Sequence, residues 1–330
     1  MDNKILVTGG SGFVGRFLIE ELLLDGSNTI VAMYNNNGIP DVFKSSPGNL
    51  SWIKNDLVSD DLTAALTDID IVYHLAGYSS VDSSTVELDR LNKINVIATR
   101  RLADACVSAQ VRHLIFVSSV AVCEGSSEAI IDEGDVLPLT PYGDSKQRAE
   151  DILIKTAKGF YEITILRPSA LFGECHEGSV YELVKKIQEK RFAIFGSGKS
   201  LTNFLYIRDF TDLLVSVKFD PRAYDQIFIA ADSPFQLKVV VDWILGALNS
   251  NMRVLVIPAW TGHCLAWFFD LASLLLNRAL PFSRRRLKAM LNDSSYSNAK
   301  VTRVMGSDCK YGVQKGLLTT IQWYRDNDML

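Results

Sequence analysis

Short apolar runs alternate with amphipathic segments through the first half of this chain. Segments with helical periodicity or polar turns separate the apolar runs from one another. Strands that are apolar throughout and separated by helices are typical of a parallel sheet covered on both faces. The pattern predicts strands at 4–10, 28–34, 51–56, 70–77, 112–119 and 161–168, and helices at 13–26, 61–69, 86–109 and 142–158.

The order of elements becomes mixed after Pro168. We expect an α/β fold, with a doubly wound parallel sheet over 1–167 and a smaller lobe over 168–330 that interleaves with the end of the sheet. Sheets of this kind bind ligands at the carboxyl ends of their strands. The predicted elements of the second half are a helix near 178–190, a glycine-rich turn at 195–200, an apolar segment at 202–210, a strand at 226–231 and a helix near 236–249.

The first strand runs directly into a glycine-rich turn that opens the first helix. Gly9, Gly12 and Gly15 have the spacing G-x-x-G-x-x-G. Glycine there permits a tight turn, close approach of the backbone to a pyrophosphate and close packing of helix on strand. Unpaired N–H groups at the helix start, at Phe13 and Val14, favour phosphate binding. Residues 1–167 are therefore predicted to be a Rossmann domain that binds NAD or NADP.

The end of the second strand normally contacts the adenosine ribose, through an acid for NAD or an arginine for NADP. This chain has Tyr34 and Asn35 at that point, followed by two more asparagines. No cation is placed to hold a 2′-phosphate, which favours NAD without excluding NADP. Asp56 and Leu57 follow the third strand, where they would contact adenine; a capping aspartate and a core leucine are the alternative interpretation.

Tyr142 and Lys146 are one helical turn apart, so both side chains can face the same cleft. A nearby ammonium favours the phenolate and is expected to lower the pKa of the phenol. Such a phenol can exchange a proton with a substrate hydroxyl while a hydride moves to or from nicotinamide. Ser118 and Ser119 end the fifth strand on the ligand side and would supply a hydrogen-bond donor for an oxyanion.

Several motifs together resemble the extended short-chain dehydrogenase/reductase family, in its branch of sugar-nucleotide epimerases and dehydratases. The resemblance covers almost the whole chain. It rests on "TGGSGFVG" at 8–15, "HLAG" at 74–77, "NV" at 95–96, "PYGDSK" at 141–146, "LRPSALFG" at 166–173, "NFLYIRDF" at 203–210 and two C-terminal segments, "SNAKVTRVMG" and "GLLTTIQWYRD".

The resemblance implies roles for individual residues. Tyr142 is expected to be the acid/base, Lys146 its partner and the holder of the nicotinamide ribose, and Ser119 the oxyanion donor with Ser118 as its helper. The family also implies a homodimer that pairs through 86–109 and 142–158. Leu75, Ala76, Gly77, Asn95, Ser118 and Pro168 complete the expected cofactor contacts.

The chain also departs from the family at positions that contact substrate. Val120 and Ala121 stand where dehydratases have an acidic pair, which argues against 4,6-dehydration. Ala170 replaces an asparagine, and Thr202 replaces an arginine that grips the nucleotide diphosphate. Arg284 is expected to supply phosphate charge instead, with a solvated basic helix end as the alternative, and Ser79 is a further candidate for substrate contact.

Two enzymatic hypotheses follow from the resemblance. The first is a UDP-hexose 4-epimerase that retains NAD, or a 4-keto reductase that exchanges it. The second applies the same catalytic residues to an apolar alcohol or ketone, as in 3β-hydroxysteroid dehydrogenases and dihydroflavonol reductases. A non-catalytic dinucleotide sensor is disfavoured because Ser119, Tyr142 and Lys146 are all present.

The apolar segment 254–282 has two interpretations. It is shorter and more interrupted than a spanning helix of roughly 20 apolar residues, so a buried or lid helix is the first interpretation and contact with a membrane surface or an apolar substrate is the second. The net charge of −4 gives no case for nucleic acid. The five scattered cysteines suggest no metal site, and no signal peptide is readable, so we expect a cytoplasmic protein.

Overall fold

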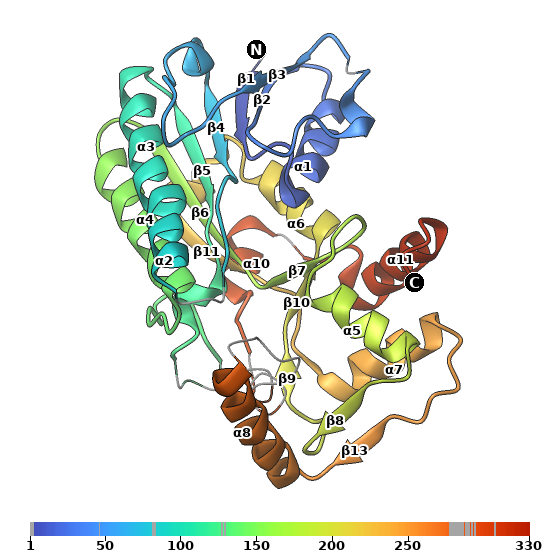
Figure 1. The fold of residues 1–330 in the computed structure, drawn as a ribbon. Coiled ribbons are helices and arrows are strands. Elements are labelled where there is room, and N and C mark those ends of the chain that lie inside the picture. Colours follow the sequence, from blue (N-terminus) through green and yellow to red (C-terminus); the bar gives the residue numbers. More distant parts are fainter. Residues whose placement is uncertain are drawn as a thin grey trace.

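A seven-stranded parallel sheet forms the centre of the computed structural model (Figure 1). The structure describes residues 3–45, 47–80, 84–126, 128, 130–276, 287, 291, 293, 295–306 and 308–330. The strand order is β3-β2-β1-β4-β5-β6-β11, which places the carboxyl ends of β1, β4 and β5 side by side. The strands are β1 (Asn3–Thr8), β2 (Asn28–Tyr34), β3 (Leu50–Lys54), β4 (Ile71–His74), β5 (His113–Val117), β6 (Glu162–Pro168) and β11 (Gln226–Ala230). The structure confirms the six strands predicted in the first half of the chain and the Rossmann-type α/β fold class.

Helices cover both faces of the sheet because its strands are apolar on both sides. On β1, Ile5 and Val7 pack in one hydrophobic cluster and Leu6 in the other. Side chains of α1, α6 and α10 belong to the first cluster, and those of α3 and α4 to the second. These helices are α1 (Phe13–Leu24), α3 (Ala98–Ser108), α4 (Pro141–Ala157), α6 (Ile207–Ser216) and α10 (Ala299–Met305).

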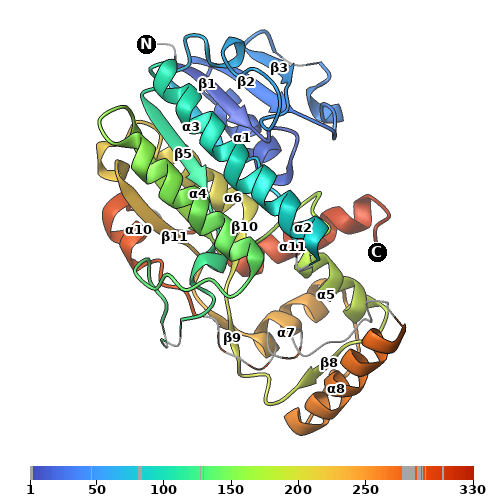
Figure 2. The same ribbon diagram turned by 60° about the vertical axis from the view of Figure 1, so that its left-hand side comes forward.

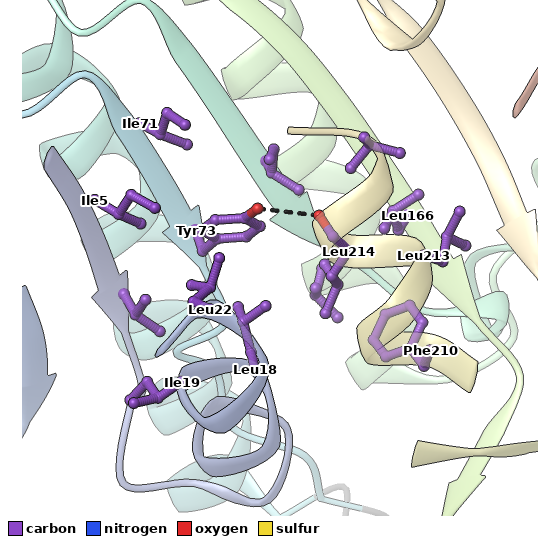
Figure 3. Packing of buried hydrophobic residues seen from close by; sticks show 14 of the residues in the cluster. Ile5, Leu18, Ile19, Leu22, Ile71, Tyr73, Leu166, Phe210, Leu213 and Leu214 are labelled. Atoms are coloured by element: carbon purple, nitrogen blue, oxygen red, sulfur yellow. Dashed lines mark hydrogen bonds between the residues drawn. The ribbon is translucent and has the colours of Figure 1, made fainter. Parts of the chain in front are cut away.

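A tyrosine hydroxyl ties one helix to the sheet within the first cluster (Figure 3). The Tyr73 hydroxyl crosses the layer and donates a hydrogen bond of 3.0 Å to the carbonyl oxygen of Leu214 on α6. Its neighbours in the figure, Ile5, Leu18 and Phe210, are all buried. The chain beyond residue 168 therefore returns to the main sheet, contributing α6 to one face and β11 to the edge.

The smaller lobe consists of short strand pairs and helices beside the carboxyl ends of the main strands (Figures 1 and 2). β7 pairs with β10, β9 with β12, and β8 with β13. Its own hydrophobic cluster includes Phe172, Ile194 and Tyr206. Its elements are β7 (Ala170–Phe172), α5 (Ser179–Gln188), β8 (Ala193–Phe195), β9 (Leu201–Thr202), β10 (Phe204–Tyr206), β12 (Phe235–Gln236), α7 (Leu237–Ala247), β13 (Leu255–Ile257), α8 (Ala259–Leu276) and α11 (Gly312–Asp326).

Two predicted helices differ from the structure. The helix expected at 61–69 is only a 3₁₀ turn at Ala64–Leu66, because the Asp61 side chain accepts hydrogen bonds from the N–H and hydroxyl of Thr63 and closes a local turn. The helix expected at 86–109 is continuous but irregular. It consists of α2 (Thr85–Leu91), a π-helical segment (Asn92–Ile97) and α3. Such π segments occur frequently at functional sites.

Candidate functional site

The glycine turn after β1 is as compact as its spacing predicts. Gly9 has a φ of +69°, and a Cβ there would lie 2.8 Å from the backbone nitrogen of Ala76 at the end of β4. A Cβ on Gly15 would collide with the Gly9 carbonyl oxygen. Gly12 caps α1 without a side-chain hydrogen bond, and the first turn of α1 has no acidic residue. The first N–H groups of α1 are therefore available to a phosphate.

A cavity of about 280 Å³ opens beside this turn, across the ends of β1, β2, β3 and β4. Its lining residues that the structure describes include no lysine or arginine, so nothing there would pair with a 2′-phosphate. Asp56 lies in the wall of this cavity, and its carboxylate accepts a hydrogen bond of 2.8 Å from the Val58 N–H. The cavity therefore fits NAD. The predicted residues in its wall are Gly9, Gly12, Tyr34, Asn35, Asp56, Leu57, Leu75, Ala76 and Gly77.

Two predicted cofactor residues at the start of α1 pack away from this cavity. The Phe13 ring stacks on His176, with ring centroids 4.1 Å apart. Val14 packs against the apolar clusters on both sides of α1. Any contact of these two residues with a pyrophosphate would be made by their backbone N–H groups.

A chain of hydrogen bonds runs behind the glycine turn. His74 Nδ1 lies 2.9 Å from the Thr8 hydroxyl, and His74 Nε2 lies 2.9 Å from the Thr99 hydroxyl. The Thr99 hydroxyl donates to the carbonyl oxygen of Asn95, so it accepts from His74 Nε2–H. Burial and the nearby charge of Lys146 lower the pKa of His74 to about 3, which keeps the ring neutral. His74 therefore has a structural role.

Asn95 lies in the π-helical segment and fixes the loop that follows β4. Its amide oxygen accepts from the Tyr78 N–H at 2.8 Å, and its amide nitrogen donates to the Tyr78 carbonyl at 2.8 Å. The same nitrogen reaches the Ser145 hydroxyl at 2.9 Å. Asn95 is buried, and these three hydrogen bonds occupy its side chain. The side chain packs against Gly77 and holds this loop in position. It does not line the dinucleotide cavity, where we had expected it.

A second cavity, of about 540 Å³, contains the predicted hydroxyl pair. Ser119 and Tyr142 both line it, together with Ser79, Pro168 and Ala170. Ser119 follows β5, and its hydroxyl accepts a hydrogen bond of 3.1 Å from the Ala121 N–H. Ser119 also hydrogen-bonds the phenol of Tyr142. The segment after β5 and the first turn of α4 thus bring the Ser119 hydroxyl and the Tyr142 phenol to the wall of one cavity.

Lys146 does not lower the pKa of Tyr142 in this structure, although the sequence predicted that it would. Desolvation raises the pKa of Tyr142, and the carboxylate of Glu124, which also lines the cavity, raises it further. Only the Ser119 hydrogen bond acts in the opposite direction. The phenol is therefore held in its protonated form at neutral pH.

Lys146 is buried beneath the loop that separates the two cavities. Its ammonium donates a hydrogen bond of 2.9 Å to the Val117 carbonyl and lies 4.7 Å from the centre of the Phe116 ring. A Cβ on Gly77 would be only 3.2 Å from Lys146 Nζ, so glycine lets the ammonium reach this loop. Burial lowers the pKa of Lys146 to about 8, against the opposing charge of Glu150.

A buried ionic network that sequence analysis did not identify lies behind Lys146. Arg167 NH2 contacts Glu150 Oε2 at 2.7 Å, and both side chains are almost fully buried. Ser118 donates a short hydrogen bond to Glu150 Oε1. Ser118 thus faces the network and does not line either cavity. Glu150 lies one helical turn after Lys146, and this spacing is the only sequence signal that could have identified it.

The four predicted substrate residues have different positions. Ser79 and Ala170 line the second cavity. Thr202 does not: it pairs with Phe235 across β9 and β12 in the smaller lobe. Arg284 lies outside the described residues.

Comparison with known proteins agrees with this geometry. A family model described as the NAD dependent epimerase/dehydratase family matches residues 5–227. An N-acetyl-alpha-D-glucosaminyl-diphospho-ditrans,octacis-undecaprenol 4-epimerase of Escherichia coli O157:H7 is 26% identical over 328 residues, covering 98% of this chain and 96% of the relative. A decarboxylating sterol-4-alpha-carboxylate 3-dehydrogenase of Saccharomyces cerevisiae is 24% identical, covering 97% of each protein.

Solved structures show the same fold. The UDP-glucuronic acid 4-epimerase from Bacillus cereus, in complex with NAD, superposes with a TM-score of 0.79 at 20% identity, covering 98% of this chain and 99% of that one. The family match spans the glycine turn, both predicted catalytic helix positions and all seven strands, except for the first two residues of β1 and the last three of β11. The chain belongs to the NAD-dependent epimerase/dehydratase family.

Proposed function

We propose that the protein is a 4-epimerase of a hexose carried on a diphosphate, with Tyr142 as the acid/base and NAD as a retained cofactor. One observation supports this most directly: Ser119 and Tyr142 share the wall of a cavity that meets the dinucleotide cavity at the 77–79 segment. Gly77 lines the first cavity and Ser79 the second, so a carbinol carbon in the second cavity can face a nicotinamide in the first.

The residues of the chain then act as a proton-exchange device. In its phenolate form, which the positive charge of bound NAD would favour, Tyr142 takes the proton of the sugar 4-hydroxyl and later returns it, while Ser119 hydrogen-bonds the oxygen at C4. NAD, when bound, supplies the acceptor for the C4 hydride. Lys146, whose ammonium packs close to Gly77, would contact the nicotinamide ribose. Because the protein raises the pKa of Tyr142, the phenol is a competent acid for the return step.

There are two candidates for the group that the diphosphate links to the sugar. A nucleotide is our main proposal, as in the UDP-sugar enzyme of Bacillus cereus. A polyprenyl chain is the second, because the relative that covers 98% of this chain acts on an undecaprenol-linked sugar. Thr202, at the position of a nucleotide-gripping arginine, pairs with Phe235 in a strand ladder and offers a diphosphate no charge.

Mass spectrometry of small molecules bound to the purified protein, followed by turnover assays, tests the proposal. We expect tightly held NAD and interconversion of UDP-hexoses, or of a polyprenyl-diphosphate sugar, without net NADH. Net NADH formation on a sugar substrate would indicate a reductase or dehydrogenase. Turnover of a sterol-like alcohol, together with failure on every diphosphate sugar, would refute the epimerase.

We propose in addition a homodimer that pairs through α2–α3 and α4. These helices pack side by side on one face of the sheet (Figure 2). Their outer surface exposes Val86, Leu88 and Ile97. A dimer that buries these residues would dissociate in a Val86→Glu/Ile97→Glu variant, which sedimentation would detect.

A further inference from the structure

In the part of helix α8 whose side chains the structure describes, residues 259–269, small residues are buried and several large apolar residues are exposed. Gly262 and Ala266 are buried and lie one turn apart. A Cβ on Gly262 would lie 2.7 Å from Leu287 and 2.8 Å from the Phe195 ring, so the helix approaches β8 closely through this face. This contact thus leaves the large side chains of Trp260, Trp267 and Phe268 outside the packing.

The opposite face of α8 is aromatic and exposed to solvent. Trp260, Trp267 and Phe268 are 69%, 61% and 62% exposed, and Leu265 is also exposed. The adjacent strand β13 adds exposed Leu255 and Val256. Scattered apolar residues are normal on a surface, but six that are concentrated within fourteen residues mark an interaction site.

This surface lies at the outer edge of the smaller lobe. In both ribbon views α8 and β13 are at the end of the molecule opposite the N-terminus, well away from the main sheet (Figures 1 and 2). The proposed dimer helices lie on the sheet, so that interface would leave α8 uncovered.

Basic side chains border one end of this surface. Leu255 of β13 pairs with Ala193 of β8. Arg253 lies two positions before Leu255, and Arg191 lies two positions before Ala193, so both arginines lie at the same end of this strand pair. Both are exposed, as is Lys190. Within the described residues neither Arg253 nor Lys190 forms an ion pair with a carboxylate, whereas the chain as a whole has a net charge of −4.

We propose that the exposed face of β13 and α8, residues 255–268, docks into the interfacial layer of an anionic lipid bilayer. Tryptophan and phenylalanine favour the boundary between headgroups and acyl chains, and neighbouring arginines attract anionic headgroups. We place the helix in the plane of the interface, because its exposed aromatic residues lie on one side and its small residues face the protein. No helix within the described residues is long and apolar enough to cross a membrane. The proposal does not depend on the substrate of the enzyme.

Co-sedimentation of the full chain with vesicles tests this directly. We expect the wild type to sediment with phosphatidylglycerol/phosphatidylcholine vesicles and to shift its tryptophan emission to shorter wavelength. Trp267→Ser/Phe268→Ser should weaken this binding by about tenfold or more. Arg253→Glu should weaken it several-fold, and high salt should reduce the difference.

Phe160→Ser is the matched control, because Phe160 is an equally exposed aromatic residue, at 65%, on the main domain. It should bind vesicles like the wild type, and all variants should retain NAD binding. Three results would overturn the proposal: wild-type protein that ignores anionic vesicles, a double variant that binds unchanged, or a wild-type dimer that dissociates in the double variant without any binding to vesicles. The last result would assign the surface to a second copy of the chain.

Discussion

Helices α4 and α8 are nearly equal in length, at 17 and 18 residues, and both depart from ordinary amphipathic burial. α4 buries Lys146 and Glu150, whereas α8 exposes Trp260 and Trp267. The buried charges of α4 have partners, in Val117, Ser118 and Arg167. The exposed aromatic residues of α8 face solvent. A helix that buries paired charges supports chemistry inside the protein, while one that exposes apolar area indicates a partner outside it.

Tyr142→Phe should have the largest effect and tests whether α4 carries the chemistry. Removing the phenol hydroxyl removes the proton exchange, so we expect turnover to fall roughly thousandfold. NAD binding should persist, because Tyr142 lines the second cavity and not the dinucleotide cavity. Single-turnover kinetics and NAD titration measure the two quantities. Near-normal turnover in this variant would disprove the assignment.

Glu150→Gln tests whether the buried charges of α4 depend on their partners. The substitution leaves the Arg167 guanidinium buried without a counter-charge, so we expect the free energy of unfolding to fall by about 3 kcal/mol. A Glu150→Gln/Arg167→Met double variant should recover much of that loss, because both charges are then absent. Urea unfolding of wild type, both single variants and the double variant would show whether the two residues are coupled, and simple additivity would contradict the network.

Two substitutions compare the inner and outer faces of α8. Gly262→Val forces added atoms against Leu287 and Phe195 and should destabilise the protein by about 1–3 kcal/mol. Trp267→Ser removes a far larger side chain but should change stability by less than about 0.5 kcal/mol, since that residue is 61% exposed. Thermal unfolding compares them. A larger loss for Trp267→Ser would mean that the tryptophan packs against the protein.

Lys146→Met tests the buried charge next to Gly77 through the pH dependence of stability. Burial lowers the pKa of Lys146 to about 8 from 10.5, so between these values the unfolded chain binds more protons than the folded one. This residue therefore makes stability rise as pH increases from about 8 to 10.5. The variant should lack that rise, seen as a pH-dependent difference from wild type in urea unfolding. A constant difference across the window would indicate an ordinary pKa.

Glu124→Gln should have the smallest effect. The Glu124 carboxylate raises the pKa of Tyr142, so removing its charge should lower that pKa and move the pH–rate profile for proton removal to lower pH. Glu128→Gln, an exposed neighbour on the same loop that does not line the cavity, is the control. An equal shift in both variants would show a general charge effect only.

The sequence by itself determined the features that depend on local spacing. Alternating apolar runs specified the parallel strands, the glycine spacing specified the turn at Gly9, and the four-residue interval placed Tyr142 and Lys146 on one face. Each follows from the periodicity of a strand or helix or from the backbone freedom of glycine, which act over a few residues.

Only the tertiary structure decided the features that depend on distant partners. Ser118 and Ser119 are adjacent, yet Ser118 faces Glu150 and Ser119 faces the cavity that Tyr142 also lines, because successive residues of an extended strand end point to opposite sides. Asn95 braces the loop at Tyr78, and α8 turns Gly262 towards Phe195, through contacts with residues distant in the sequence. Which neighbour a side chain meets is set by packing between elements far apart in the chain, and local periodicity does not encode it.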